Sequence, residues 1–595
     1  MRYRILRNTG DALYRYLPGS ITDFADGRVI ARASKWSSER ASVPGRRRII
    51  ERIQFELSKF RGRDPAFPDS GHAERYEFFE PNTIELQFFP LTIFDAGTGY
   101  HHRFGSIDQL DSYLQRVGRE ASIRQRDLVH ISSNGEMESL LVPKCPVHGV
   151  QAVTLDTSRG NLRQFVWKCA LCNNSLGGIE GFAGGQKVIG ATPVRSTSAF
   201  IPQIITMVRI AMDIEEIGPR DALDPLIVAK YLGLLNEDFD LKKGITTVAP
   251  SIALSAAQVE NIAKQYGMKP SDVSKILQAG DSERKAPAER AVSEVLNVFP
   301  EIRDKPQVTV SIFEYLMLRG EMATSLNSLE TESTGSQRDK FSTFRMAFNS
   351  IGVSEAFHVP IVPLIQAAYG YTREDFDPRR TIIRAFPIDG MDHEGHVPIY
   401  VNITESEGIL LVFDRKRILD WLTSNQFLGE EGRHVNDEKS WFLRNVSPFK
   451  PSFAGGTSPS PERDLFNLIH TIAHALTKSI TLPSGLAAES IGELFFPNVP
   501  AVLLYTHEGG GFKTGGLEDL FQNKAFTWLK IAIERLKTCV YDPVCLNSQA
   551  ACHHCLFTSE VACSHFNADL SRRVLFGWKD PKLTGFWEKT VDQFL

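Results

Sequence analysis

Apolar residues recur at helical spacing in several segments, and these segments predict the main helices of the chain. A helix is expected to begin near Arg46, just after the Pro-Gly break at residues 44–45. Its apolar positions are Ile49, Ile50, Ile53 and Leu57. A second, strongly amphipathic helix is expected from Leu465, where the apolar positions fall within one narrow stripe. Further helical segments are predicted over residues 106–121, 341–371, 415–422 and 517–536.

Shorter apolar runs predict strands, and Pro- and Gly-rich stretches predict the connections between elements. Strands are expected within residues 84–94, 399–413 and 501–505. Loops or linkers are expected at residues 61–71, 331–338 and 449–461. Residues 255–266 and 271–277 predict two helices around a turn; such a pair is more often a packing unit than a DNA-reading one.

The length of 595 residues, with 42% hydrophobic and 23% charged residues, is sufficient for several cores. The predicted fold class is α+β with several domains. The expected divisions are a basic α+β domain over residues 1–140, a zinc-ribbon-like module over 141–180, a mostly helical domain over 181–330, an α+β connecting domain over 331–460 and a metal-binding domain over 461–595.

The N-terminal sequence has no apolar run or cleavage site typical of a signal peptide, and no stretch reaches the roughly 18 apolar residues that span a bilayer. These observations predict a cytoplasmic protein without membrane contact.

Charge is unevenly distributed along the chain. The net charge is −4, yet residues 1–63 contain 15 Lys and Arg against 6 Asp and Glu, a local charge of +9. Arginines bind phosphates and interleaved aromatics stack on bases, so this region predicts contact with DNA. The alternative is an ordinary solvated surface. The candidate nucleic-acid contacts are Arg2, Arg4, Arg7, Arg46, Arg47 and Arg48.

Five of the eight cysteines lie within twenty-five residues near the C-terminal end of the sequence, and they predict a zinc site. They are Cys539, Cys545, Cys552, Cys555 and Cys563. Cys552 and Cys555 form a C-x2-C pair and are the safest ligands; one of the other three is in excess of the four that zinc needs. Disulfides and a redox-active C-x2-C are the alternatives, neither supported by other features of the sequence.

The remaining cysteines form a second candidate zinc site. Cys145 and His148 are followed, after a twenty-residue gap, by Cys169 and Cys172. Short apolar segments at residues 152–155 and 165–167 are suited to the strands of a zinc ribbon. Three thiolates and one imidazole predict a closed, structural site, so two zinc ions are expected in the chain.

His470 and His474 stand four residues apart, on the helix face opposite the apolar stripe. Such a pair can chelate a metal, with a carboxylate such as Glu489 or Glu493 as a third ligand, and this would suit a metal-dependent nuclease or hydrolase. The zincin glutamate is absent, however, and two hydrogen-bonded histidines in a doubly buried helix are the simpler interpretation. The Gly-rich segment 509–516 has Phe512 where a phosphate-binding loop requires glycine, which argues against ATP binding.

Several motifs together resemble the zinc-binding domain of MrfA-type DNA repair helicases and, more closely, the DrmB family of the DISARM antiphage system. They are His470-Thr-Ile-Ala-His474, Gly485, Ser490, Val502-Leu-Leu-Tyr-Thr506, Thr514-Gly-Gly-Leu517, Asp542-Pro-Val-Cys545, Ala551-Cys-His-His-Cys555 and Ala562-Cys563, with Tyr369-Gly-Tyr-Thr-Arg373, Ser406-Glu-Gly-Ile-Leu410 and Ile418-Leu-Asp-Trp421 upstream. The resemblance extends motif by motif over residues 340–577. Ala562 and Ser564 depart from it, since a serine and a glutamate usually flank that cysteine.

The resemblance implies a helicase-associated, four-cysteine zinc-binding domain over residues 461–595. It further implies a non-catalytic, DNA-binding scaffold subunit that partners a separate superfamily 2 helicase, similar to DrmA, in bacterial defence. Helicase motifs are absent from this sequence, so the ATPase is expected in the partner.

Overall fold

The computed structural model describes most of the 595 residues. The residues that it leaves undescribed are 1–12, 15, 25–28, 70, 119–121, 133–134, 181, 184–185, 211–216, 218–219, 242–243, 245–262, 265–268, 270, 272–286, 321, 374, 376, 387–395, 450–459, 508–514, 560–561, 579–582 and 589–595. Arg2, Arg4 and Arg7 therefore lie outside the described residues. So do most of the predicted helical pair 255–277, most of the linker 449–461 and most of the Gly-rich segment 509–516.

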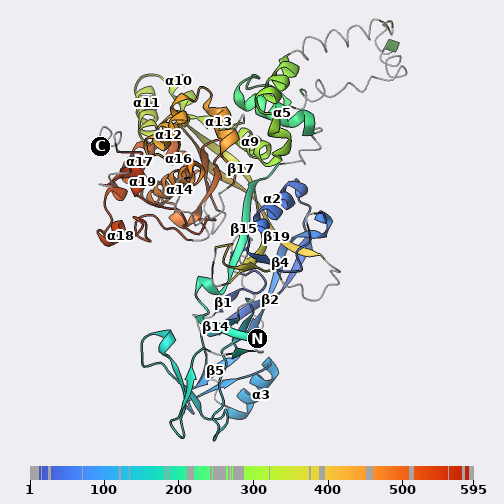
Figure 1. Ribbon diagram of the computed structural model, residues 1–595, viewed down its shortest axis with the longest axis vertical. Coiled ribbons are helices and arrows are strands. Elements are labelled where there is room, and N and C mark those ends of the chain that lie inside the picture. Colours follow the sequence, from blue (N-terminus) through green and yellow to red (C-terminus); the bar gives the residue numbers. More distant parts are fainter. Residues whose placement is uncertain are drawn as a thin grey trace. The chain divides into compact units, whose positions relative to one another are not determined.

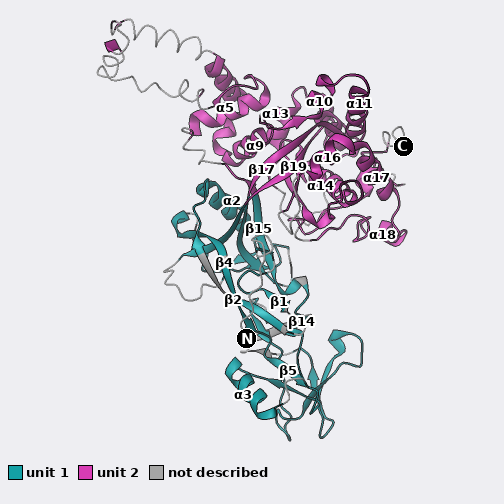
Figure 2. Ribbon diagram, turned by 180° about the vertical axis from the view of Figure 1, so that it is seen from behind, with its two compact units in different colours: residues 1–206, 365–403 teal, residues 207–364, 404–595 magenta. Residues whose placement is uncertain are grey.

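The chain forms two compact units, which Figure 2 distinguishes by colour. Unit 1 contains residues 1–206 and 365–403, and unit 2 contains residues 207–364 and 404–595. Three strands have residues in both units: β15 (Ile201–Val208), β17 (Val353–Thr372) and β19 (Val397–Phe413). The five-domain division stays a prediction.

Unit 1 is built mainly from antiparallel strands. β1, β2 and β4 pair in that order. β4 also pairs, in parallel, with the first residues of β19. Smaller sheets have the orders β6-β5-β7, β13-β14-β8-β9 and β10-β11-β12, and β18 pairs with β3. The elements are β1 (Ile21–Phe24), β2 (Val29–Arg40), α2 (Arg46–Ser58), β3 (Gly62–Arg63), β4 (Tyr76–Phe88), β5 (Thr92–Asp95), β6 (Tyr100–Arg103), α3 (Ile107–Val117), β7 (Ile123–Gln125), β8 (Leu128–Ser132), β9 (Met137–Ser139), β10 (Val153–Asp156), β11 (Val166–Cys169), β12 (Ser175–Gly178), β13 (Phe182–Ala183), β14 (Gln186–Pro193) and β18 (Ile382–Ile383).

Unit 2 combines strands with most of the helices, many of which are labelled in Figure 1. β20 pairs with β21, β21 pairs with the second part of β19, and β16 pairs with β17. The elements are α5 (Arg220–Leu232), α9 (Pro306–Leu318), β16 (Thr324–Ser325), α10 (Leu326–Glu332), α11 (Gly335–Ser350), α12 (Arg415–Ser424), α13 (Glu438–Asn445), α14 (Pro461–Ser479), α15 (Thr481–Ser484), β20 (Ile491–Phe496), β21 (Ala501–Thr506), α16 (Gly516–Asn523), α17 (Ala525–Lys537), α18 (Val544–Asn547) and α19 (Arg573–Phe576).

Helix α14 lies at the centre of one of the two large cores of unit 2. Ser460 caps its first turn by accepting from the N–H of Arg463, and Pro461 occupies the first helical position, where its missing N–H costs nothing. Every residue from Leu468 to Thr477 is buried. The indole N–H of Trp528 in α17 donates to the carbonyl of Leu476 at 2.9 Å, which fixes α17 against α14.

Most predicted elements are confirmed, but three expectations for unit 2 are wrong. The segment 341–371, predicted to be helix-rich, is helical only to Ser350, and β17 follows as a twenty-residue strand from Val353. The helix predicted over 517–536 is two helices, α16 and α17, with Lys524 between them. The connection predicted at 331–338 is reduced to two residues between α10 and α11.

No helix within the described residues is both long enough and apolar enough to cross a membrane. The mixture of helices and strands in more than one compact unit confirms the predicted α+β, multidomain fold class.

Candidate metal centres

Four thiols of unit 2 converge into one group, which we call the four-thiol cluster: Cys539, Cys545, Cys552 and Cys555. The Sγ atoms of Cys539 and Cys552 are 3.6 Å apart, those of Cys552 and Cys555 are 3.6 Å apart, and those of Cys545 and Cys555 are 3.8 Å apart. Sulfurs at the corners of a tetrahedron around Zn²⁺, each about 2.3 Å from the ion, are about 3.8 Å apart. Disulfide sulfurs would be about 2.05 Å apart, so the geometry excludes disulfides.

Short turns bring these thiols together. Cys539 lies two residues after the end of α17, and its backbone N–H donates to the carboxylate of Asp542 at 2.9 Å. Cys545 lies in the single-turn helix α18, and the chain then reverses through Ala550, whose φ is 55°. The backbone N–H of Cys552 donates to the sulfur of Cys555 at 3.2 Å, as expected when that sulfur is a thiolate.

Cationic groups surround the four-thiol cluster and offset the charge of its sulfurs. Arg572 has a fully buried side chain that donates to the sulfur of Cys545 at 3.5 Å and to the carboxylate of Asp542 at 2.7 Å. Arg535 and Lys478 donate to backbone carbonyls of the loop around Cys555, those of His553, His554 and Phe557. Four thiolates with one Zn²⁺ carry a net charge of −2, so nearby cations stabilise such a site.

Cys563, the fifth thiol, lies in a separate group. Together with His470, His474 and Glu493 it forms what we call the His–Glu–Cys cluster, whose four ligand atoms all lie within 4.8 Å of one another. The two histidines come from α14, Glu493 from β20, and Cys563 from the loop after Cys555. The sequence spacing does not show which four of the five thiols form one site. The structure groups Cys539, Cys545, Cys552 and Cys555, and places Cys563 elsewhere.

The groups of the His–Glu–Cys cluster are buried, and their charges shift one another's pKa values. Burial raises the pKa of Glu493, but the charges of His474 and His470 outweigh it and hold that pKa far below its usual range. Burial lowers the pKa of His474, while Glu493 and Cys563 raise it well above its ordinary value. Burial and Glu493 raise the pKa of the Cys563 thiol, yet His474 and His470 lower it to about 7.

The central cluster of Cys145, His148, Cys169 and Cys172 also converges as predicted, within unit 1. The Nδ1 of His148 is 3.8 Å from the sulfur of Cys145 and 3.5 Å from that of Cys169, and the sulfurs of Cys145 and Cys172 are 3.7 Å apart. These separations fit the edges of a tetrahedron formed by one imidazole and three thiolates around Zn²⁺.

Two tight backbone turns build the central cluster. Cys145 and Gly149 exchange both backbone hydrogen bonds at 2.8 Å, with Gly149 at φ 67°, a conformation that favours glycine. Asn173 occupies the same place in the second turn, at φ 56°, and donates to the carbonyl of Cys169. The backbone N–H of His148 lowers the pKa of the Cys145 thiol, which favours the thiolate that zinc requires.

The four-thiol cluster and the central cluster therefore have the ligand types and spacing of closed, structural zinc sites. Each has four protein ligands and no position left for water. The three-stranded ribbon β10-β11-β12 carries the central cluster, with Cys169 at the end of β11. The four-thiol cluster joins the end of α17 to α18 and the following loop, at the red end of the colour range in Figure 1.

The predicted DNA contacts that the structure describes are three consecutive arginines at the start of α2. Arg47 is exposed and pairs with Glu51 at 3.1 Å. Arg46 is exposed as well, but donates to the backbone carbonyls of Glu74 and Tyr76. Arg48 is only 7% exposed, so its side chain is directed into the core rather than toward solvent. Contact of these residues with DNA stays a prediction.

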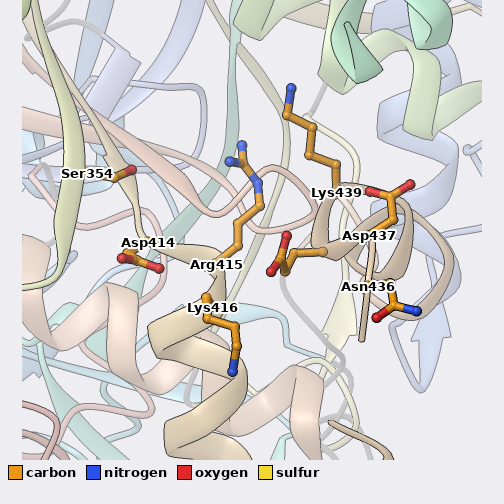
Figure 3. A pocket seen from close by; sticks show the side chains of 8 residues that line it. Ser354, Asp414, Arg415, Lys416, Asn436, Asp437 and Lys439 are labelled. Carbon is orange, nitrogen blue, oxygen red and sulfur yellow. The ribbon is translucent and has the colours of Figure 1, made fainter. Parts of the chain in front are cut away.

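A polar cavity of about 420 Å³ in unit 2 contains none of the predicted site residues (Figure 3). Several of its charged side chains form hydrogen bonds with neighbouring elements. Asp414 caps α12, Asp437 caps α13, and Arg415 donates to the hydroxyl of Tyr231. Lys439 donates to a backbone carbonyl, that of Tyr231. With cations and anions interleaved and engaged, this cavity has no set of convergent groups for a ligand.

Sequence reasoning missed some residues that complete the metal centres. Arg572 follows the last cysteine by nine residues and carries no recognisable spacing signal. Asn567 donates its backbone N–H to the sulfur of Cys563 at 3.4 Å, and its side chain is held by two hydrogen bonds to the backbone of Thr558. Of the two carboxylates considered as partners for the histidines, Glu493 reaches them and Glu489 is exposed.

Comparison with known proteins supports this assignment of the C-terminal region. Residues 472–556 match the family model of the MrfA Zn-binding domain, and residues 8–199 match a family described as a domain of unknown function, DUF8724. Over 205 residues the chain is 26% identical to the DISARM protein DrmB of Bacillus paralicheniformis. That match covers 31% of this chain and 33% of the relative, so the chain matches about a third of the relative's length.

The region that matches the zinc-binding family contains α14 from Ile472 onward and all four residues of the four-thiol cluster. The chain therefore carries an MrfA Zn-binding domain in its C-terminal region and is similar, over about a third of its length, to the DISARM protein DrmB.

Proposed function

We propose that this chain is a non-catalytic subunit of a DISARM-type antiphage defence system, in which it holds DNA beside a superfamily 2 helicase. The proposal rests on the similarity to DrmB and on one structural observation: both cysteine clusters are closed. Four protein ligands around a zinc ion leave no open position for an activated water, so these centres stabilise structure and do not perform hydrolysis.

Zinc would fix two regions of the chain that have few other stabilising elements. The β10-β11-β12 ribbon has four-residue strands, and the segment after α17 contains only the single-turn helices α18 and α19 among its described residues. Metal binding by thiolates supplies folding free energy directly, and short elements depend on it most. Rigid surfaces of this kind are suited to contacts with a partner protein or with DNA.

The rival function, a metal-dependent nuclease that uses His470 and His474, is less well supported. Both side chains are at most 1% exposed, and the side chain of Glu493 is 4% exposed. A hydrolytic centre must admit a phosphodiester and keep a water on the metal, which a site enclosed on all sides does not allow.

DNA binding is proposed from the basic N-terminal region, of which Arg47 is an exposed representative. Each phosphate that a cationic side chain binds releases counterions, so affinity should fall as salt rises. A protein-only scaffold, in contrast, would not be retained on DNA even at low salt.

We expect the purified full chain to bind DNA at low salt and not to cut it in Mg²⁺ or Mn²⁺. Replacing Arg2, Arg4, Arg7 and Arg47 with Gln should reduce the slope of log affinity against log salt by about one for each phosphate that the variant no longer binds. Arg433→Gln, a change of an exposed arginine outside the basic region, serves as the matched control and should leave the slope unchanged.

Two outcomes would contradict the proposal. DNA cleavage that is abolished by His474→Ala would establish the nuclease, and absence of DNA retention at the lowest salt would establish a scaffold that binds only protein.

A further inference from the structure

The His–Glu–Cys cluster is not accounted for by the two zinc sites above. It consists of four ligand-type side chains from three separate segments, buried inside unit 2. The Nε2 atoms of His470 and His474 are each 3.3 Å from the same oxygen of Glu493, and the Nε2 of His470 is 3.3 Å from the sulfur of Cys563. Four atoms that can bind a metal ion therefore lie around one point.

The hydrogen-bond partner of His474 leaves the lone pair of its Nε2 directed toward the cluster. The Nδ1 of His474 is 2.9 Å from the carbonyl oxygen of Leu556, which can only accept, so Nδ1 carries the proton. In a neutral ring the Nε2 of His474 is then a lone pair, and it faces an oxygen of Glu493 that also only accepts. An attractive interaction between these two atoms requires a positive charge between them.

The sulfur of Cys563 shows the same preference for a cation. It accepts the backbone N–H of Asn567 at 3.4 Å, as a thiolate does. Among the described residues the ion-pair partners of Glu493 are the two histidines, with no Lys or Arg beside it. The four-thiol cluster, by comparison, has Arg572 against one of its sulfurs.

The distances match a tetrahedral metal site. Nitrogen and oxygen ligands at about 2.0–2.2 Å from a zinc ion are about 3.3–3.6 Å apart. The observed separations between the imidazole nitrogens and Glu493 are 3.3 Å. The hydrogen bond from His474 to Leu556 is the outer interaction that commonly fixes the ring of a metal-bound histidine.

Charge balance favours a divalent ion. One carboxylate and one thiolate carry −2, so Zn²⁺ with two neutral imidazoles makes the buried site neutral. Without a metal, the same buried site has to hold the carboxylate of Glu493, the thiolate of Cys563 and a protonated histidine. Buried charges are costly unless they are fully paired. Imidazole, thiolate and carboxylate together are a donor set suited to zinc.

We propose that His470, His474, Glu493 and Cys563 bind a third, structural Zn²⁺ that ties α14, β20 and the loop after Cys555 together. With four protein ligands the ion is closed to water, which fits a His-x3-His pair whose side chains are buried rather than set in an open cleft. The proposal does not depend on a helicase partner or on DNA binding.

Zinc content and zinc-edge X-ray absorption of the full chain test this proposal. The expected result is three zinc ions per chain, with the eight cysteine sulfurs shared among three ions. If only the two cysteine clusters bind metal, two ions share seven sulfurs, and the average number of sulfurs per zinc is higher.

Variants locate the third ion. Glu493→Gln and Cys563→Ser should each reduce the zinc content from three to two, while His553→Gln, a change of an exposed histidine in the same region, should leave it at three. Two zinc ions with the higher sulfur average in the wild-type chain would overturn the proposal, and this result is independent of whether a variant folds.

Discussion

Arg572 is a buried residue that contacts both a sulfur of the four-thiol cluster and the backbone that supports it. Its guanidinium donates to the carbonyls of Ala550 and Leu536 as well as to Asp542 and Cys545. It therefore links three segments of the zinc domain while it offsets the charge of a thiolate. Groups that touch metal ligands in this way commonly change metal affinity when they are removed.

Arg572→Met should lower the free energy of unfolding by about 3 kcal/mol, because a buried cation is removed while its carboxylate and carbonyl partners stay. Zinc affinity of the four-thiol cluster should fall about 10- to 100-fold. Competition with a chromogenic zinc chelator measures the affinity, and chemical denaturation measures the stability.

The matched control is Arg433→Met, because Arg433 is 53% exposed and its ion pair with Glu430 lies at the surface. Such a pair contributes about 0–1 kcal/mol, so the control should resemble the wild type. Equal behaviour of the two variants would refute the role assigned to Arg572.

The ligand spacing of Cys552 and Cys555 and of the central cluster could be predicted from sequence because the ligands within each pair are local. The place of Cys563 could not, because its neighbours His470 and Glu493 are far away in the chain and meet it only through the packing of α14 against β20. The roles of Arg572 and Asn567 could not be predicted from the sequence for the same reason.

At the scale of elements, one buried carboxylate of β19 holds the start of helix α16. Glu407 accepts the backbone N–H groups of Gly515 and Glu518 at 2.7 and 2.5 Å, and it also lies 3.0 Å from the imidazole of His358. Gly515, the residue before the helix, has no capping side chain of its own. Glu407 thus supplies the missing cap from a neighbouring strand.

Glu407→Gln should lower the melting temperature at neutral pH by an amount that corresponds to about 3 kcal/mol. Burial raises the pKa of Glu407, but His358 and the N–H groups of Gly515 and Glu518 lower it below its ordinary value. A lowered pKa means that the stabilisation is present above the unfolded-state pKa and is lost as the pH falls through the folded-state value. Calorimetry at pH 7 measures the melting temperatures of this variant and of Glu430→Gln, which serves as an exposed control. Equal melting temperatures of the two variants would contradict the capping role of Glu407.

Removal of zinc should loosen the metal-bound elements and leave the rest of unit 1 intact. A strong chelator is expected to accelerate hydrogen exchange in β10, β11 and β12, whose strands are four residues long, while β2 and β4 keep their protection. Exchange followed by mass spectrometry of the full chain makes this comparison within one sample. Unchanged protection of the ribbon after zinc removal would show that the metal does not hold it.

Helical periodicity and turn residues predicted α2, α3, α12 and α14 correctly, because each has one apolar face or a clear cap. The strand β17 is difficult to distinguish from a helix by sequence, because most of its residues are buried on both faces. An apolar run of that kind has no alternation to distinguish strand from helix.

At the scale of the whole molecule, the chain has two compact units, each with its own closed cysteine site: the central cluster in unit 1 and the four-thiol cluster in unit 2. Neither site has an open metal position, and the sequence has no helicase motif. Under the proposed function, the chain would hold a partner helicase and DNA together, and ATP hydrolysis would belong to the helicase.

The most direct test of this account is co-purification of the full chain with a candidate superfamily 2 helicase, followed by assay of ATP hydrolysis with and without DNA. We predict a stable complex in which the helicase subunit hydrolyses ATP in response to DNA, while the chain alone hydrolyses neither ATP nor DNA. A chain that fails to bind the helicase at low salt, or that cuts DNA or hydrolyses ATP by itself, would contradict the proposed role.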